Sequence, residues 1–241
     1  MLSAEKNESS VKVLSTEECL QRWKDKKYNP TYRSFYSSWL GGITTEPQWM
    51  TLPMDDHMVH RGDGVFEAFR AIHGKIYLLK EHMDRLERSS ELIGLKWPKT
   101  RDQVVSLIYQ TLQASGLDTA IFRLFISRGP GGFSPSPYES YGSQLYIVVS
   151  DFKPMEESYY QQGVKVIIGK TPSKTGAFSQ VKSCNYLPNV LLKKEALDQG
   201  ALFGLFVDDQ GFITESSTEN LAYISERKEF VLPQFDNVLK G

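Results

Sequence analysis

The segment DFKPMEE, residues 151–157, is the feature that most limits how this chain can fold. A strand-like run ends there, Pro154 follows, and a new strand pattern begins at Val164 after a short acidic stretch. A break of this kind is typical of a linker between domains. We therefore expect an N-terminal α/β domain over residues 1–150 and a second domain over residues 158–241.

Local signals predict a hairpin and three helices in the first part. Ser15 followed by Glu18 is a capping-box pattern, which predicts a short helix. The alternating run around His73 and Gly74 predicts a β-hairpin. Two further helices, each closed by a glycine, are predicted at residues 79–94 and 100–116.

The rest of the chain continues to alternate between strand and helix patterns. Strands are predicted at 120–129 and 143–152, with a Gly-, Pro- and Ser-rich loop between them, and a third strand is predicted at 164–170. A helix from Pro188 to Gly200 and a hairpin that turns at 209–211 follow. This pattern predicts an α/β (α+β) fold in two domains.

Composition narrows the class of protein. Lys and Arg number 28 and Asp and Glu number 29, so no net field favours nucleic acid or an anionic membrane. No window is apolar enough to span a membrane, and the polar opening segment is unlike a signal peptide. The two cysteines, Cys19 and Cys184, and the four histidines fit no metal-ligand spacing. We expect a soluble, cytoplasmic protein without a metal.

Lys182 is the first candidate for chemistry. It follows a run of small polar residues and precedes the helix predicted from Pro188, so its side chain could enter a cleft. A desolvated lysine has a lowered pKa and can form a Schiff base with an aldehyde or ketone. A lone lysine before a helix is, however, more often a surface residue with a solvated ammonium.

Two more charged residues have a chemical and a structural interpretation. Glu215, at the end of the second hairpin strand, could face a protonated ring nitrogen or cap the following turn. Arg85 shares a helix face with His82 and Ser89 and could bind a phosphate, or it could form a surface ion pair with Glu81. Neither residue decides the matter alone.

Five segments in order give these residues a context. They are DDHMVHRGDGVFEAFR, KEHMDRLERSSELIG, IFRLFISRG, VKSCNYLPNVLLKKEALDQGA and DDQGFITESSTENLAYI. In this order the chain resembles the class IV aminotransferases, pyridoxal-phosphate enzymes of fold type IV that include branched-chain and D-amino-acid aminotransferases and aminodeoxychorismate lyase. The resemblance implies a smaller N-terminal α/β domain, a larger cofactor-binding domain with a barrel-like sheet, and a homodimer.

The resemblance also implies roles for individual residues. Lys182 matches the lysine that binds pyridoxal 5'-phosphate as an internal aldimine and then moves the α-proton. Glu215 matches the partner of the pyridine nitrogen, and Arg85 matches the arginine on the phosphate. Tyr186 resembles the tyrosine on the phenolic oxygen, although it stands one residue closer to the lysine. Ser216, Ser217 and Asn220 fall in the family's cofactor-side loop, behind the direct contacts, with Ser216 and Asn220 expected to help bind the cofactor. Substrate contacts are implied at Arg61 and Arg123.

The implied reaction is transfer of an amino group between a small amino acid, of branched-chain or D type, and a 2-oxo acid. One alternative is a lyase that releases p-aminobenzoate and pyruvate, but Phe133 stands where a lyase-type arginine is expected. Another is an inactive paralogue that acts as a binding partner. Family members continue beyond the position of Gly241 with a phosphate-binding turn and helices, so we expect a C-terminally incomplete chain that binds the cofactor weakly.

Overall fold

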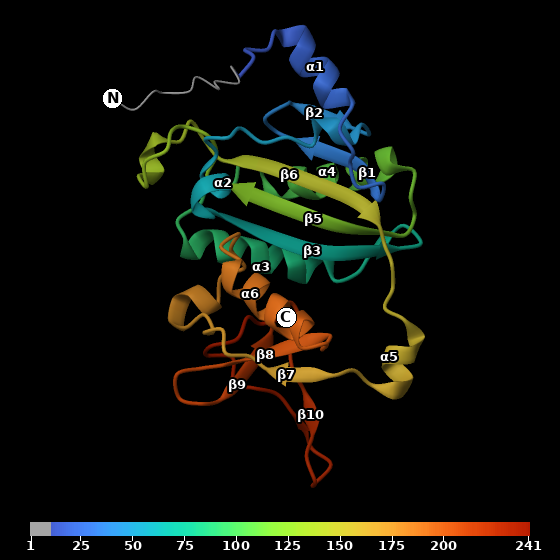
Figure 1. Cartoon of the computed structure of the whole chain (residues 1–241), viewed down its shortest axis with the longest axis vertical. Coiled ribbons are helices and arrows are strands. Elements are labelled where there is room, and N and C mark those ends of the chain that lie inside the picture. The colour runs from blue at the N-terminus through green and yellow to red at the C-terminus, as the bar shows by residue number, and fades with distance from the viewer. Residues whose placement is uncertain (1–10) are drawn as a thin grey trace, which may run out of the picture.

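The computed structural model describes residues 11–241. Residues 1–10 lie outside the described residues. The expectation that the opening segment is not a signal peptide falls partly on these residues. The upper half of the molecule in Figure 1 is built on a six-stranded antiparallel sheet with the order β2-β1-β6-β5-β3-β4. Its strands are β1 (Tyr32–Ser37), β2 (Gly42–Thr44), β3 (Gly64–Ile72), β4 (Lys75–Ile76), β5 (Ala120–Ser127) and β6 (Gln144–Asp151).

In the described part of the chain, four α-helices accompany this sheet; the three predicted helices are confirmed, and the short helix His57–Arg61 was not predicted. Ser15 caps the first helix in a complete capping box with Glu18. The predicted hairpin turns at His73 and Gly74, which have φ angles of 49° and 73° and so form the left-handed turn that suits a two-residue loop. The helices are α1 (Thr16–Lys24), α2 (His57–Arg61), α3 (Leu79–Leu92) and α4 (Arg101–Ser115), with short 3-10 helices η1 (Pro47–Trp49) and η2 (Pro137–Glu139).

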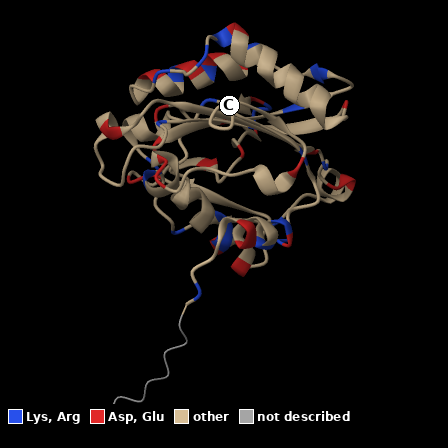
Figure 2. Cartoon of the chain, turned by 90° about the horizontal axis from the view of Figure 1, so that it is seen from above, with Lys and Arg blue, Asp and Glu red and all other residues tan. Residues whose placement is uncertain are grey.

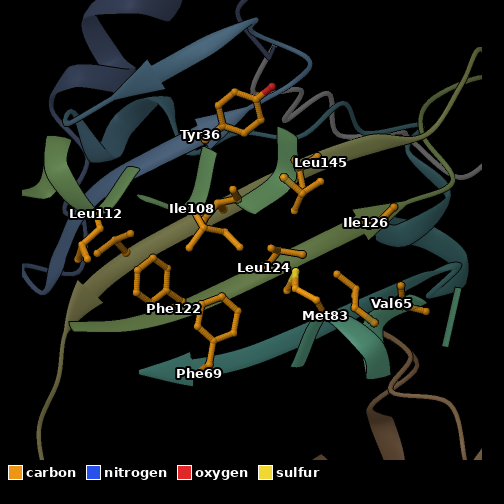
Figure 3. Close-up of a cluster of buried hydrophobic side chains, with 14 of the residues drawn as sticks. Tyr36, Val65, Phe69, Met83, Ile108, Leu112, Phe122, Leu124, Ile126 and Leu145 are labelled. Atoms are coloured by element: carbon orange, nitrogen blue, oxygen red, sulfur yellow. The ribbon is translucent and has the colours of Figure 1, made fainter. Parts of the chain in front are cut away.

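Alternate side chains of β5 point to the two faces of the sheet, and one of these faces packs into the hydrophobic core. Phe122, Leu124 and Ile126 are fully buried and pack with Met83 of α3 and Ile108 of α4, as Figure 3 shows. Successive side chains of a strand point to opposite faces, so the residues between them face away from these helices. This alternation turns the side chain of Arg123 toward the second part of the chain.

The second part of the chain forms a smaller sheet and a short ribbon. In the sheet, β8 pairs in parallel with β7 and antiparallel with β9. The predicted helix and the second hairpin are confirmed. The elements are α5 (Glu157–Gln162), β7 (Val166–Ile168), η3 (Gly176–Ser179), α6 (Leu187–Asp198), β8 (Phe203–Val207), β9 (Ile213–Ser216), β10 (Tyr223–Ile224) and β11 (Phe230–Val231). This sheet has three strands within residues 11–241, where a barrel-like sheet was expected.

The two parts of the chain meet at the free edge of β3. Phe66 N donates a hydrogen bond to Lys182 O at 2.9 Å, and Cys184 N donates to Gly64 O at 2.8 Å. Strand β6 ends at Asp151 and α5 begins at Glu157, so the segment between them has no regular structure. The division into two domains at residues 151–157 remains a proposal.

The surface matches the balanced composition. Figure 2 shows Lys and Arg segments interleaved with Asp and Glu segments along the outer helices. Among residues 11–241, no helix is both long and apolar enough to cross a membrane. The cytoplasmic location remains a prediction.

Close packing at the β3 edge makes Gly64 the first position to test. A Cβ at Gly64 would lie 2.9 Å from Ile126 O and 3.4 Å from Cys184 Sγ. We expect Gly64→Ala to lower the free energy of unfolding by about 1–3 kcal/mol, because β3 would have to move away from β5 or from the Lys182 segment. Urea unfolding followed by circular dichroism measures this change.

Gly42→Ala is the matched control. A Cβ there would have no heavy atom within 4 Å, so we expect a change within about 0.5 kcal/mol. Equal free energies of unfolding for the two variants would contradict this account of the β3 edge.

Candidate active site

A cavity of about 620 Å³ lies between the first sheet and the second part of the chain. Phe66 and Ala68 of β3 and Arg123 and Phe125 of β5 form one wall. The opposite wall comes from the segment before α6 and from the end of β9 and the turn after it. All of the residues proposed for chemistry except Arg61 line this cavity, namely Lys182, Arg85, Tyr186, Glu215, Ser216, Ser217, Asn220 and Arg123.

Lys182 is fixed by its backbone and desolvated at its side chain. Its N donates to Ser89 Oγ at 3.2 Å, while its O accepts the hydrogen bond from β3. The ammonium lies 4.7 Å from the ring centre of Phe66 and 6.0 Å from that of Tyr186. Burial, with a smaller contribution from Arg85, lowers the pKa of Lys182 to about 8. Lys182 therefore reaches the neutral form about two pH units below an ordinary lysine, although most of it is still protonated at pH 7.

The pKa of Glu215 is shifted upward, whereas that of Lys182 is shifted downward. Burial raises the pKa of this carboxyl to about 7, although Leu239 N donates to it at 3.3 Å. Asn220 Nδ2 also donates, at 3.4 Å. The turn after β9 is held by another residue, because Ser216 Oγ donates to Glu219 Oε2 at 2.8 Å. The capping role considered for Glu215 thus belongs to Glu219.

Arg85 is held by a buried carboxylate. Its Nε and Nη2 donate to the two carboxylate oxygens of Glu67 at 2.6 and 2.7 Å, and Glu67 is fully buried. His82 Nδ1 lies 2.8 Å from Glu67 Oε2. Burial alone would raise the pKa of Glu67, but hydrogen bonds from Arg85 and His82 outweigh it and hold this pKa below the usual range. The ion-pair partner of Arg85 is therefore Glu67 and not Glu81.

Tyr186 and the two arginines expected to contact substrate differ in their placement. The Tyr186 ring packs edge-on against Phe66, with 5.1 Å between ring centres. Arg123 lies in the cavity wall, where burial lowers its pKa. Arg61 does not reach the cavity, because its guanidinium donates to Phe133 O at 2.6 Å and to the carbonyl of its own neighbour His60.

Two charged residues near the site were not predicted. Glu67 stands in phase with Val65 and Phe69 on the buried face of β3, and a carboxylate in such a position signals a buried partner. Lys174 lines the cavity from an irregular segment, where no periodic pattern could single it out.

Similarity to known proteins defines the class of this one. The chain belongs to the class IV aminotransferases, because the amino-transferase class IV family model matches residues 64–241. It is 40% identical over 235 residues to the chloroplastic D-amino-acid transaminase of Arabidopsis thaliana, and the match covers 96% of this chain and 62% of that protein. This chain thus spans less than two thirds of the length of that curated relative.

Solved structures show the same fold. The T.th. branched-chain amino acid aminotransferase with pyridoxamine 5'-phosphate superposes with a TM-score of 0.80 at 20% identity, over 87% of this chain and 70% of that one. The branched-chain amino acid aminotransferase of Escherichia coli gives 0.79 at 21% identity, over 87% and 71%. The expected α/β fold of type IV is therefore confirmed.

The lowered pKa of Lys182 predicts how its amine responds to pH. Only the neutral amine reacts with an acylating reagent, so we expect labelling of Lys182 to rise with a midpoint near pH 8. Lys80 is an internal reference, because its ion pair with Asp84 raises its pKa and moves its midpoint upward. Pulse labelling with acetic anhydride, read by mass spectrometry of peptides, measures both residues in one sample. A shared midpoint would refute the desolvation of Lys182.

The buried pair of Glu67 and Arg85 predicts a large effect on stability. Glu67→Gln leaves the guanidinium without its charged partner, so we expect the free energy of unfolding at pH 7 to fall by about 3–5 kcal/mol. Glu81→Gln removes the alternative partner and should change it by no more than about 0.5 kcal/mol. Urea unfolding of both variants tests which carboxylate holds Arg85.

The same pair has a defined pH dependence. The pKa of Glu67 in the folded chain lies below its ordinary value of 4.5, so its stabilising contribution is present above pH 4.5. This contribution is lost as the pH falls through the folded value. The difference between wild type and Glu67→Gln should therefore shrink in acid, and a difference that stays constant would contradict the assignment.

Proposed function

We propose that this chain catalyses pyridoxal-phosphate-dependent transfer of an amino group between a small amino acid, of branched-chain or D type, and a 2-oxo acid. The observation that carries the proposal is the presence of Lys182, Glu215 and Arg85 in one cavity, where burial moves the pKa values of the first two toward neutrality. Class IV aminotransferases are pyridoxal-phosphate enzymes, and the fold is theirs. A homodimer remains part of this proposal.

The residues that line the cavity fit this cofactor. A volume of about 620 Å³ lies within the usual range of small-molecule sites. Lys182 offers an amine for the aldehyde, Glu215 a carboxyl for the ring nitrogen and Arg85 a cation for the phosphate. In addition, the buried Asn189 Oδ1 at the cavity wall accepts no hydrogen bond from the described residues. It is therefore available to a ligand.

Each of these side chains would have a definite task. When bound, pyridoxal phosphate supplies an aldehyde for the substrate amine and a ring that takes up the electron pair left at the α-carbon. Lys182 Nζ, neutral above pH 8, can accept the α-proton and return it. Glu215 can hold a proton at its carboxyl near pH 7. Phe66 and Phe125 exclude water from the β3–β5 wall.

Glu67 would contribute through Arg85. Because Glu67 takes Nε and Nη2, the guanidinium is fixed in one orientation, and Nη1 alone points elsewhere and donates to Lys240 O at 3.0 Å. A guanidinium held in this way is an anchor of fixed geometry for an anion.

Removing the amine of Lys182 tests the proposed function directly. We expect Lys182→Ala to reduce kcat for transfer from D-alanine or leucine to 2-oxoglutarate by about 100- to 10,000-fold, the usual contribution of a positioned base. Lys194→Ala is the control, because Lys194 lies on the exposed face of α6 in an ion pair with Asp198. A coupled assay for glutamate measures both.

Other outcomes would replace the proposal. Release of p-aminobenzoate from aminodeoxychorismate without a 2-oxo acid would indicate the lyase. A wild-type chain with neither activity, whose cellular effect survives Lys182→Ala, would indicate a binding partner.

A further inference from the structure

Lys174 is a cation in the cavity to which no role has been assigned. It lies between β7 and η3, and its ammonium is 4.7 Å from the ring centre of Tyr186. Within residues 11–241 no hydrogen bond or ion pair neutralises it, and the one carboxylate that acts on it is Glu215, through space. Lys174 is therefore an uncompensated charge beside Tyr186, which Lys182 also approaches.

The other cations of the cavity already have a partner or a proposed role, with the exception of Arg123. Arg85 is paired with Glu67, and Lys182 supplies the amine of the proposed reaction. Among residues 11–241, Arg123 donates only to the carbonyl of its own neighbour, Phe122, at 3.1 Å. Apart from Lys182, which supplies the amine, Lys174 and Arg123 are thus the cavity cations without a carboxylate partner in the described part of the chain.

The carboxylates that line the cavity do not compensate Lys174. Glu219 accepts hydrogen bonds from Ser216 and Thr218 in its own turn. Glu215 is close to half-protonated at pH 7, because burial raises its pKa to about 7. The cavity therefore holds more positive than negative charge, which favours an anionic ligand.

The contact with Tyr186 does not remove this charge. A cation over a ring is attracted only weakly, whereas a partly buried ammonium also loses hydration. Burial accordingly lowers the pKa of Lys174. An anion that enters the cavity would replace the lost hydration, and the ammonium would not have to break an ion pair in order to meet it.

We propose that Lys174 binds a carboxylate of the amino acid or 2-oxo acid and so contributes to substrate specificity. Both substrates are carboxylic acids, and the phosphate already has Arg85. The inference rests on the proposed function only in calling the acid a substrate. Binding of the acid itself requires no reaction.

Binding of glutarate tests the proposal without catalysis. Glutarate carries two carboxylates and has no amino or oxo group to react. With pyridoxal phosphate present, we expect Lys174→Met to raise the Kd of glutarate by about 10- to 100-fold, the size of a charge-assisted hydrogen bond. Lys174→Arg should restore most of the affinity. Isothermal titration calorimetry measures the Kd, and Lys170→Met, an exposed lysine of the same segment, is the control.

Steady-state kinetics with pyruvate and with 2-oxoglutarate distinguish which carboxylate of the substrate Lys174 binds. Lys174→Met should raise KM by a similar factor with little change in kcat, because a binding contact is lost and the base remains. If KM rises for both pyruvate and 2-oxoglutarate, Lys174 binds the carboxylate that the two acids share. A rise for 2-oxoglutarate alone places Lys174 on the second carboxylate.

Three results would overturn the inference. These are no binding of glutarate to the wild type, equal glutarate affinity in wild type and Lys174→Met, or a loss confined to pyridoxal phosphate affinity in an absorbance titration. Glutarate binding through Lys174 in a chain that transfers no amino group would instead overturn the proposed function alone. Amino transfer with unchanged KM in Lys174→Met would overturn this inference alone.

Discussion

The free edge of β3 is the constraint on which the site depends. One edge of β3 pairs along its length with β5, and β4 covers only the end of the other edge. The Lys182 segment fills the remaining edge with two backbone hydrogen bonds. These two hydrogen bonds fix the register of the Lys182 segment against β3, and the Lys182 ammonium lies 4.7 Å from the ring centre of Phe66. A Cβ at Gly64 would lie 2.9 Å from Ile126 O, so the close approach of β5 to β3 favours glycine at this position.

Burial at this junction gives the two central groups similar proton affinities. The pKa of Lys182 falls to about 8 and that of Glu215 rises to about 7, each mainly because burial disfavours the charged form. Glu67 is more deeply buried but stays ionised, because Arg85 donates two hydrogen bonds to its carboxylate and His82 Nδ1 lies 2.8 Å from it. Desolvation therefore makes one pair of groups titrate near neutrality, and pairing keeps the other fixed as ions.

Local patterns in the sequence predicted most of the elements, and the order of motifs singled out residues that the structure brings into one cavity. The capping box at Ser15 and the turn at Gly74 depend only on neighbouring residues, so they could be read directly. Arg61 does not line the cavity because it ends α2 and its guanidinium donates to Phe133 O, a contact that no local pattern predicts. The Glu67 to Arg85 pair joins a strand to a helix, and such a contact exists only once α3 packs on β3. The alternation of β3 marks Glu67 as a buried carboxylate that needs a partner, but only the packing of α3 on β3 shows that the partner is Arg85.

The cavity contains one cation that is fixed by an ion pair, Arg85, and others that have no carboxylate partner in the described part of the chain. Arg85 is fixed by a buried carboxylate, so it can present one unchanging geometry to an anion. Lys174 sits on a flexible side chain over a ring, and Arg123 is bound only to a backbone carbonyl. Neither needs to break an ion pair in order to reach a ligand. A rigid cation suits a cofactor that is always the same, whereas adjustable cations suit acids of different length. Under the proposed function, this division allows one cofactor site to serve more than one substrate.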